Sequence, residues 1–178
     1  TDPVTAARAF AAACHDGQRR KDACGSPYII HLAEVAALVT AFGGDATAQA
    51  AAWLHDTVED CPPTDLGDLR ARFGDETADI VAEETDDKAL PKRQRKRLQI
   101  VRAPERSAAA TLGKLCDKAS NCAAVGFTPA VGWDAARRLA YLDWSEEVAA
   151  ALPQGHARAR AHLAGVIAVS RERVAMTG

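Results

Sequence analysis

The sequence lacks a long apolar run, has few aromatic residues and shows no large excess of one charge. Its longest apolar stretches, such as 35–39 and 50–54, fall far short of the roughly 20 residues that span a bilayer. Aromatic residues make up 5% of the chain, and the formal net charge is −2. This charge provides no global attraction to nucleic acid or to an acidic partner. We therefore expect a soluble protein with no membrane span and no nucleic-acid partner, in which any basic site is local.

The cysteines show no pairing pattern. The chain has five of them, an odd number, and no two stand in a C-x-x-C spacing. This disfavours a disulfide framework and a structural zinc knuckle, and it favours the reducing cytoplasm. We expect Cys14, Cys116 and Cys122 to be small core residues. The chain begins at Thr1 rather than Met, so the sequence leaves open whether a native N-terminal segment precedes it.

Long alternation of apolar and polar residues, the pattern of strands, is also missing, whereas apolar residues recur at helical spacing. We predict an all-α protein with a single domain over residues 1–178, because this length suffices for one buried core and no linker divides it. In the last helix, the residues expected to face inward are Leu163, Val166, Ile167 and Val169. The predicted helices cover roughly residues 3–15, 28–42, 46–60, 66–73, 75–85, 91–97, 107–121, 133–150 and 153–174.

The motif His55-Asp56, followed by Glu59-Asp60, is the strongest candidate for a functional site. An imidazole nitrogen and a carboxylate oxygen from adjacent residues can bind one divalent metal. We expect the third helix to run through Asp60. Residues four apart then share a face, so that one pair binds the metal and the other faces substrate or water.

Two residues on other predicted helices extend this site. His31 lies in the first turn of the second helix, and Asp117 lies among apolar neighbours, where a carboxylate is costly unless it is paired or bound to a metal. Two imidazoles and two carboxylates leave Mn²⁺, Fe²⁺, Zn²⁺ and Mg²⁺ open. Such an ion activates water for hydrolysis near neutral pH. Glu59 or Asp60 could orient or deprotonate that water, or protonate a leaving oxygen.

Basic residues gather in the loop at 16–27 and in the run 88–97. Such runs are usually solvated faces. No aromatic residue interleaves the second run, so it gives no platform for stacking nucleic-acid bases. The alternative is that some of these cations face the metal and neutralise the charge of an oligophosphate.

The order of these motifs resembles the HD superfamily of metal-dependent phosphohydrolases. More specifically, it resembles the hydrolase domain of the Rel/SpoT proteins and, because no synthetase or regulatory segment is present in the sequence, the stand-alone small alarmone hydrolases of the metazoan SpoT type. The matching stretches are Gln18-Arg19-Arg20-Lys21, Gly25-Ser26-Pro27-Tyr28-Ile29-Ile30-His31, His55-Asp56-Thr57-Val58-Glu59-Asp60, Thr85-Asp86-Asp87-Lys88-Ala89-Leu90-Pro91-Lys92 and Lys114-Leu115-Cys116-Asp117-Lys118.

The resemblance implies a compact HD-domain helical bundle and removal of the 3′-diphosphate of (p)ppGpp as pyrophosphate, which leaves GDP or GTP. It implies one Mn²⁺ per chain, held by His31, His55, Asp56 and Asp117. It also implies catalytic roles for Glu59, Asp60 and Asn121. The residues implied to bind the nucleotide substrate are Arg20, Lys21, Lys92, Arg137 and Tyr141.

Several alternatives stay open. Relatives of the metazoan type also resemble NADPH phosphatases, and some small relatives hydrolyse (p)ppApp. A non-enzymatic alternative is a nucleotide-binding sensor, or an antitoxin component, whose metal serves stability. The chain departs from the family pattern at Ala119-Ser120, where a bulky residue usually precedes the Asn121 position, and this predicts looser packing around the base. Monomer and homodimer are both open.

Overall fold

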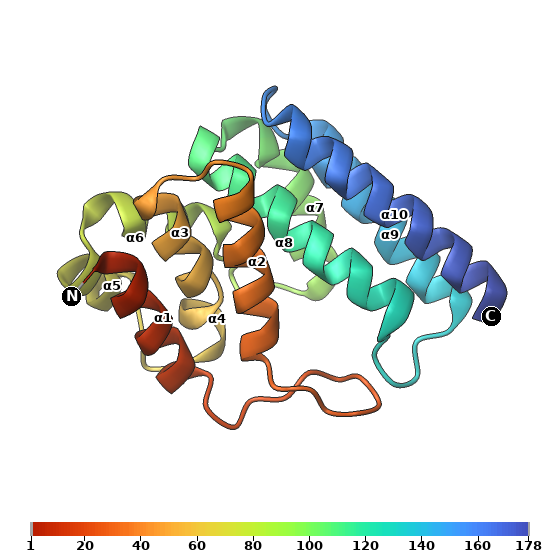
Figure 1. The fold of residues 1–178 in the computed structure, drawn as a ribbon, viewed down its shortest axis with the longest axis horizontal. Helices are drawn as coiled ribbons and strands as arrows, with labels where there is room; N and C mark the ends of the chain where they lie inside the picture. Colours follow the sequence, from red (N-terminus) through yellow and green to blue (C-terminus); the bar gives the residue numbers. More distant parts are fainter. Residues whose placement is uncertain (1, 178) are drawn as a thin grey trace.

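A computed structural model describes residues 2–177, and within that range all regular structure is helical apart from two isolated β-bridges (Figure 1). None of the helices in this range combines the length and the apolar character needed to cross a bilayer. The elements are α1 (Pro3–Cys14), α2 (Ile29–Ala41), α3 (Ala46–Leu54), α4 (Thr57–Asp60), α5 (Leu66–Phe73), α6 (Asp75–Glu84), α7 (Lys92–Val101), the 3₁₀-helix η1 (Ala103–Glu105), α8 (Ala108–Phe127), α9 (Ala135–Ala151) and α10 (Ala157–Thr177).

Helix ends follow the local capping chemistry of the sequence. The side chains of Asp2, Asp45 and Ser107 each accept a hydrogen bond from a backbone N–H in the first turn of the helix that follows. At the other end of α5, Gly74 adopts a φ of 86°, a conformation that glycine reaches without steric cost. The helix boundaries are therefore largely fixed by short-range sequence.

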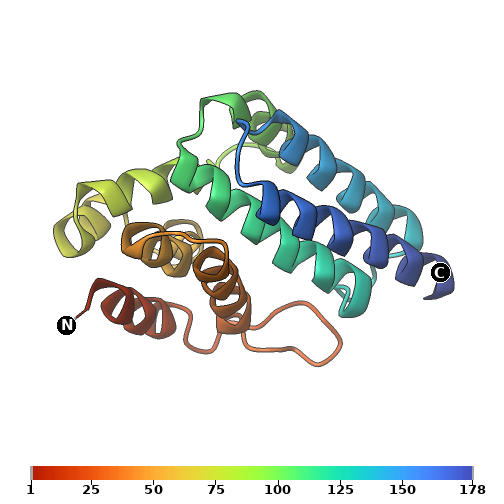
Figure 2. The same cartoon turned by 45° about the horizontal axis from the view of Figure 1, so that its top comes forward.

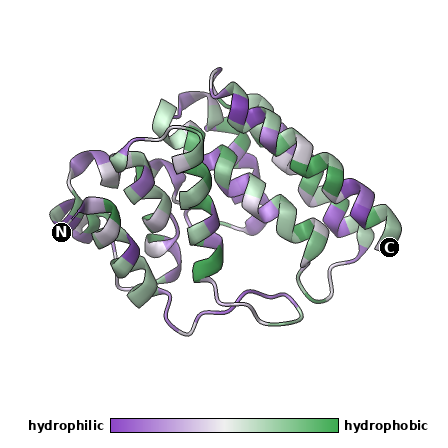
Figure 3. Ribbon diagram, in the orientation of Figure 1, coloured by the Kyte–Doolittle hydropathy of each residue, from purple (hydrophilic) through white to green (hydrophobic). Residues whose placement is uncertain are grey.

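α8 is the central element of the molecule. It packs against α9 and α10 on one side and against α2, α3 and α6 on the other, and Figure 2 shows α8, α9 and α10 side by side as one layer. One apolar cluster, which includes Leu115, Leu142 and Leu163, lies between α8 and its neighbours, and a second, which includes Leu54 and Leu69, lies under α1, α3 and α6. The mostly apolar α2 packs against α8, and most of its ribbon is green in Figure 3.

The predicted third helix is wrong in one respect that matters for function. Instead of running from Ala46 to Asp60, it ends at Leu54, and a separate turn, α4, follows after His55 and Asp56. The Thr57 hydroxyl donates to the Leu54 carbonyl at 2.7 Å, and a His55 ring nitrogen bonds the Ala52 carbonyl at 2.7 Å. Side chains thus occupy carbonyls near the helix end, which is the competition by which polar side chains interrupt helices.

Two smaller predictions also need correction. α8 continues to Phe127, six residues beyond the predicted end at Asn121, because Cys122 and Val125 extend its buried face. In α10, Leu163 and Ile167 are buried as predicted, but Val169 is 47% exposed. Val169 lies two residues from Ile167, and a shift of two residues turns a side chain to the far side of a helix.

The basic loop at 16–27 is held by two backbone hydrogen bonds. The Lys21 carbonyl accepts a hydrogen bond from the backbone N–H of Val131, in the α8–α9 connection, and the Tyr28 N–H bonds the Gln18 carbonyl. The loop therefore lies between α2 and the end of α8 with its cations held near the ligand-bearing helices.

Candidate metal centre and surrounding cleft

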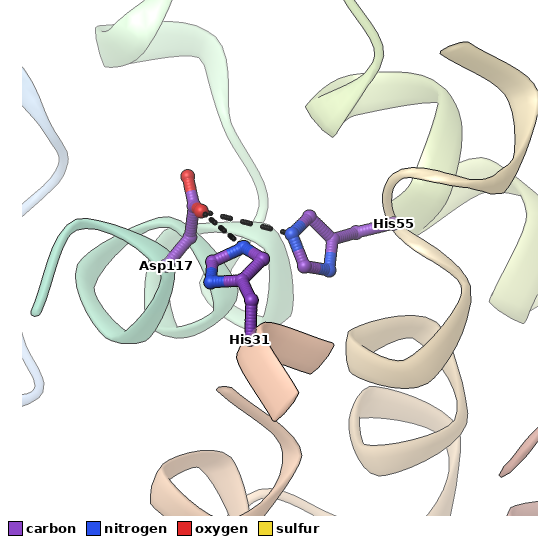
Figure 4. Close-up of side chains that lie close together, drawn as sticks. All are labelled: His31, His55 and Asp117. Atoms are coloured by element: carbon purple, nitrogen blue, oxygen red, sulfur yellow. Dashed lines mark ion pairs between the residues drawn. The ribbon is translucent and has the colours of Figure 1, made fainter. Parts of the chain in front are cut away.

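His31, His55 and Asp117 come from distant parts of the chain and converge in one buried cluster (Figure 4). They belong to α2, the α3–α4 break and α8. Nε2 of His31 lies 3.3 Å from Oδ1 of Asp117, and Nε2 of His55 lies 3.6 Å from the same oxygen. One ligand atom from each residue lies within 4.8 Å of the other two, which makes the cluster compact enough for a single ion.

Asp56 approaches the cluster from the α3–α4 break. Its Oδ2 lies 3.2 Å from Nε2 of His55 and 3.6 Å from Nε2 of His31. The Tyr28 hydroxyl donates to the same oxygen at 2.7 Å and so fixes the carboxylate. His55 and Asp56 lie between α3 and α4, and both keep backbone dihedrals in the right-handed helical region.

The donor set and its spacing fit a divalent ion. Bonds of about 2.0–2.2 Å from one ion to N and O ligands place neighbouring donor atoms about 3–3.5 Å apart. The imidazole–carboxylate separations in the cluster are 3.2–3.6 Å. Nδ1 of His55 must donate to the Ala52 carbonyl, so its Nε2 carries the lone pair, and this atom is buried with no hydrogen-bond partner.

The electrostatics also favour a cation. Burial opposes a positive charge on His55, but the carboxylates of Asp56 and Asp117 outweigh burial and raise its pKa well above the ordinary value. Burial likewise opposes ionisation of Asp117, yet the Lys114 charge and the two imidazoles hold its pKa well below the usual range. The two carboxylates therefore favour positive charge at this place, which is the charge that a bound cation would supply.

The acidic pair after the motif takes two different environments. The Asp86 N–H donates to Oε1 of Glu59 at 2.6 Å, and burial raises the pKa of Glu59 to about 7. Asp60 instead accepts from Lys88 and from Gln18 on its two oxygens. Glu59 is thus suited to exchange a proton near neutral pH, whereas Asp60 joins the basic loop to the segment before α7.

Two adjoining cavities flank the cluster. One of about 400 Å³ contains Arg20 and Lys21, and one of about 230 Å³ contains Asp56, Asp117 and Lys92. Residues that line both are Tyr28, Asn121 and Tyr141.

Of the predicted substrate residues, Arg137 lines neither cavity. Its guanidinium lies 4.4 Å from the ring centroid of Trp133, which lines the larger one. Asn121 donates from Nδ2 to Oδ1 of Asp117 at 2.9 Å, so it contacts a metal-cluster carboxylate directly.

Sequence reasoning missed several residues of the cleft. Glu84, Lys114 and Lys118 are buried and line the smaller cavity. Lys118 Nζ lies 3.5 Å from the ring centroid of Trp144, and burial lowers the pKa of Lys118 to about 7. Glu84 had a usable signal, because it follows Ile80 and Val81 at helical spacing on the apolar face of α6.

Comparison with protein families decides the identity of this architecture. A family model for the HD domain matches residues 7–116. The chain belongs to the HD-domain family. This assignment and the converging His and Asp side chains together indicate a divalent-metal site.

Named relatives place this HD-domain protein more narrowly. It is 44% identical over 141 residues to human guanosine-3′,5′-bis(diphosphate) 3′-pyrophosphohydrolase MESH1, and the aligned residues cover 78% of each chain. It is 36% identical over 132 residues to the guanosine-3′,5′-bis(diphosphate) 3′-pyrophosphohydrolase of Vibrio cholerae, over 71% of this chain and 18% of that one. The solved structure of a metazoan orthologue of SpoT that hydrolyses ppGpp matches with a TM-score of 0.88 and 34% identity, over 93% of this chain and 94% of that one. The predicted all-α HD-domain bundle is thereby confirmed.

Proposed function

We propose that this HD-domain protein hydrolyses the 3′-diphosphate of (p)ppGpp-type alarmones, releasing pyrophosphate and leaving GDP or GTP. The observation that carries the proposal is the buried His/Asp cluster, which adjoins a cavity lined by Arg20 and Lys21 and one lined by Lys92. The chain shares 44% identity with a named ppGpp 3′-pyrophosphohydrolase, MESH1. We place the reaction in the cytoplasm.

The proposed cofactor is one Mn²⁺ held by His31, His55, Asp56 and Asp117. Two imidazole nitrogens with two carboxylates form a mixed donor set of intermediate hardness, which suits Mn²⁺ and leaves room for an open position. When bound, such an ion polarises phosphate oxygens and activates water near neutral pH. The distances from each imidazole Nε2 to a carboxylate oxygen of Asp56 and of Asp117 suit donors to one ion.

In the proposed hydrolysis, a water oxygen attacks the phosphorus atom that is attached to the ribose 3′-oxygen. The bond between this phosphorus and the 3′-oxygen breaks. Glu59 takes the proton from water, because its pKa of about 7 keeps it half ionised at neutral pH. The same group, once protonated, can return the proton to the 3′-oxygen that leaves. Asp60, held by Lys88 and Gln18, keeps the loop cations in place, and Asn121 holds the Asp117 carboxylate.

The substrate phosphates find complementary charge in the cleft. Arg20 and Lys21 line the cavity on one side of the cluster, and Lys92, Lys96 and Arg95 line the cavity on the other. Tyr141 lines both, and its ring faces Trp133 with centroids 5.7 Å apart. Fixed cations neutralise the charge that accumulates on the transferred phosphoryl group. The aromatic pair offers a surface on which a nucleobase can stack, with Arg137 over Trp133 at its edge.

A substrate panel tests this function. Purified protein is incubated with Mn²⁺ and with ppGpp, pppGpp, ppApp or NADPH, and the products are separated by ion-exchange chromatography. We expect one pyrophosphate for each GDP formed from ppGpp, and no turnover by His55→Ala. Orthophosphate from NADPH alone would favour the phosphatase, and preferential cleavage of ppApp would favour an adenine alarmone. Nucleotide binding without any turnover would favour the nucleotide-binding sensor over the enzyme.

A further inference from the structure

A hydrogen-bonded chain leads from the metal cluster to an exposed carboxylate on α2. His31 is 1% exposed, and its Nδ1 lies 2.9 Å from Oγ of Ser120, on α8. Ser120 is 4% exposed, and its hydroxyl donates to Oε2 of Glu34 at 2.6 Å. Glu34 is on α2, one turn after His31, and is exposed to solvent. The three residues form a relay, which we call the Glu34–Ser120–His31 relay.

The chemistry of the three groups gives the relay one direction. An ionised carboxylate can only accept hydrogen bonds, so the Ser120 hydroxyl proton points to Glu34. The hydroxyl has a single proton, and its oxygen can therefore only accept from the His31 ring. Nδ1 of His31 then carries the ring proton, and the lone pair is on Nε2. Nε2 is the atom that lies 3.3 Å from Asp117 and faces the cluster.

We propose that Ser120 and Glu34 are positioning residues that fix the tautomer and the ring orientation of His31 for metal binding. Partners of this kind, a carboxylate or hydroxyl behind a ligating imidazole, orient the ring and raise its basicity toward the ion. The inference rests on the proposed function only in so far as both need the metal site. It adds two residues that contact neither the substrate cavities nor the metal.

The relay lies beside the proposed substrate cavities. Ser120 and Glu34 line a third cavity of about 340 Å³, between α2 and the end of α8, together with Ile30, Phe127 and Arg20, and Arg20 also lines the cavity of about 400 Å³. Neither residue lines either of the two cavities that contain the metal-cluster acids and the proposed substrate cations. The sequence predicted only looser packing around the base from the small residue at 120. The structure gives Ser120 a further contact. Its side chain is directed to the back of a metal ligand.

The test compares three relay variants with two matched controls. Ser120→Ala removes the hydroxyl, Ser120→Thr restores it, and Glu34→Gln supplies an amide that can donate to Ser120 and thereby release the direction of the chain. Ser170→Ala is the control for a buried hydroxyl, because Ser170 donates to a backbone carbonyl of α8, that of Cys122, and not to a side chain of the cluster. Glu147→Gln is the control for an exposed carboxylate on α9.

Two measurements are made without nucleotide. The Mn²⁺ dissociation constant is obtained from the electron paramagnetic resonance signal of the free ion. We expect Ser120→Ala to raise this constant by about 10- to 100-fold, Glu34→Gln to raise it by less, and Ser120→Thr to restore it. The controls are expected to retain the wild-type constant. In protein loaded with diamagnetic Zn²⁺, the histidine ring N–H resonances are recorded by ¹⁵N NMR, and the His31 signal should be lost or shifted in Ser120→Ala but retained in Ser120→Thr and in both controls.

An unchanged dissociation constant in both Ser120→Ala and Glu34→Gln would overturn the relay, and so would an unchanged His31 ring N–H resonance in Ser120→Ala. Equal weakening of binding in Ser170→Ala would also overturn it, because the effect would then be general destabilisation. None of these measurements uses a nucleotide. Failure of the relay is therefore distinct from failure of the proposed function, which would appear as no pyrophosphate release by the wild type.

Discussion

At the scale of single residues, the division of labour between Glu59 and Asp60 follows from their neighbours. Both are carboxylates in the turn after the metal motif, and sequence reasoning assigned them the same set of roles. The structure gives Asp60 two hydrogen-bond donors, one of them the cationic Lys88, and gives Glu59 a backbone N–H and a more buried place. Because burial raises the pKa of Glu59 to about 7, Glu59 is the better proton carrier.

Part of the candidate site was predictable from the sequence. The convergence of His31, His55 and Asp117 could be expected because a His-Asp pair occurs together with other candidate ligands in a family-like order, and a buried Asp is costly unless it is paired or bound to a metal. Tyr28, Gln18 and Glu84 were not predicted as site residues. The Tyr28 hydroxyl reaches Asp56 across 28 residues of sequence, and Gln18 reaches Asp60 across 42. Contacts of this kind depend on how helices pack, and no local spacing rule encodes them.

The Glu59→Gln variant tests the raised pKa and the proton-carrying role together. A pKa raised from 4.5 to about 7 means that the folded state prefers neutral Glu59. In metal-free protein, this preference is fully present below pH 4.5 and is lost as the pH rises to about 7. The amide that replaces the carboxyl in the variant stays neutral. The wild type should therefore lose roughly 2 kcal/mol of unfolding free energy relative to the variant between pH 5 and pH 8 in urea titrations.

The same Glu59→Gln variant should lose about 10²- to 10⁴-fold in kcat for pyrophosphate release, because it cannot accept a proton. Its Mn²⁺ affinity should change little. Wild-type kcat together with a pH-independent stability difference would remove Glu59 from the proposed mechanism. A loss of Mn²⁺ binding would instead identify it as a metal ligand.

At the scale of elements, the interruption between α3 and α4 carries two residues of the cluster, His55 and Asp56. The sequence predicted one helix through Asp60, since helical periodicity continues across the motif. Periodicity cannot show that the Thr57 hydroxyl and the His55 ring take the carbonyls of Leu54 and Ala52. Most other helix boundaries were predicted well because capping residues such as Asp2, Asp65 and Gly74 act locally.

Replacing Thr57 by Val tests the role of this interruption. Thr57 is fully buried and its hydroxyl donates to Leu54 at 2.7 Å, so Thr57→Val should lower the unfolding free energy by about 1–3 kcal/mol. Mn²⁺ affinity should fall as well, because His55 and Asp56 precede the altered turn. Thr40→Val is the matched control: its hydroxyl makes the same kind of bond, to the Ala36 carbonyl, at an exposed site on α2.

The control variant should keep both stability and metal affinity, and Thr57→Ser, which retains the hydroxyl, should recover most of the loss. Chemical denaturation and calorimetric Mn²⁺ titration supply the two readouts. If Thr57→Val and Thr40→Val behaved alike, the interruption would owe nothing to the Thr57 hydroxyl.

At the scale of the whole molecule, a chain of net charge −2 brings five basic and five acidic residues together around the cavity next to the metal cluster. The cluster lies where α2, the α3–α4 break and α8 meet, so the metal ligands connect the helices that carry the two apolar clusters. Trp53 and Ala109 pack against both clusters. The all-α class was predictable from composition and periodicity, whereas this meeting point required the tertiary structure.

Metal removal should therefore destabilise the molecule as a unit. In differential scanning calorimetry we expect a single transition, as for one domain, with a lower Tm in the presence of a chelator. Mn²⁺ at about 100 times its dissociation constant should add about 2.7 kcal/mol of unfolding free energy. Asp117→Asn should show no such increase. Two separate transitions would contradict the single domain, and a Tm indifferent to Mn²⁺ would contradict the metal site.

The most direct measurement is the anomalous diffraction of crystals grown with Mn²⁺, recorded at the manganese absorption edge. The account predicts one strong peak per chain, bonded to Nε2 of His31, Nε2 of His55 and carboxylate oxygens of Asp56 and Asp117. A peak elsewhere, or none at this place with His31 or Asp117 turned away from His55, would contradict the metal centre and with it the proposed hydrolysis.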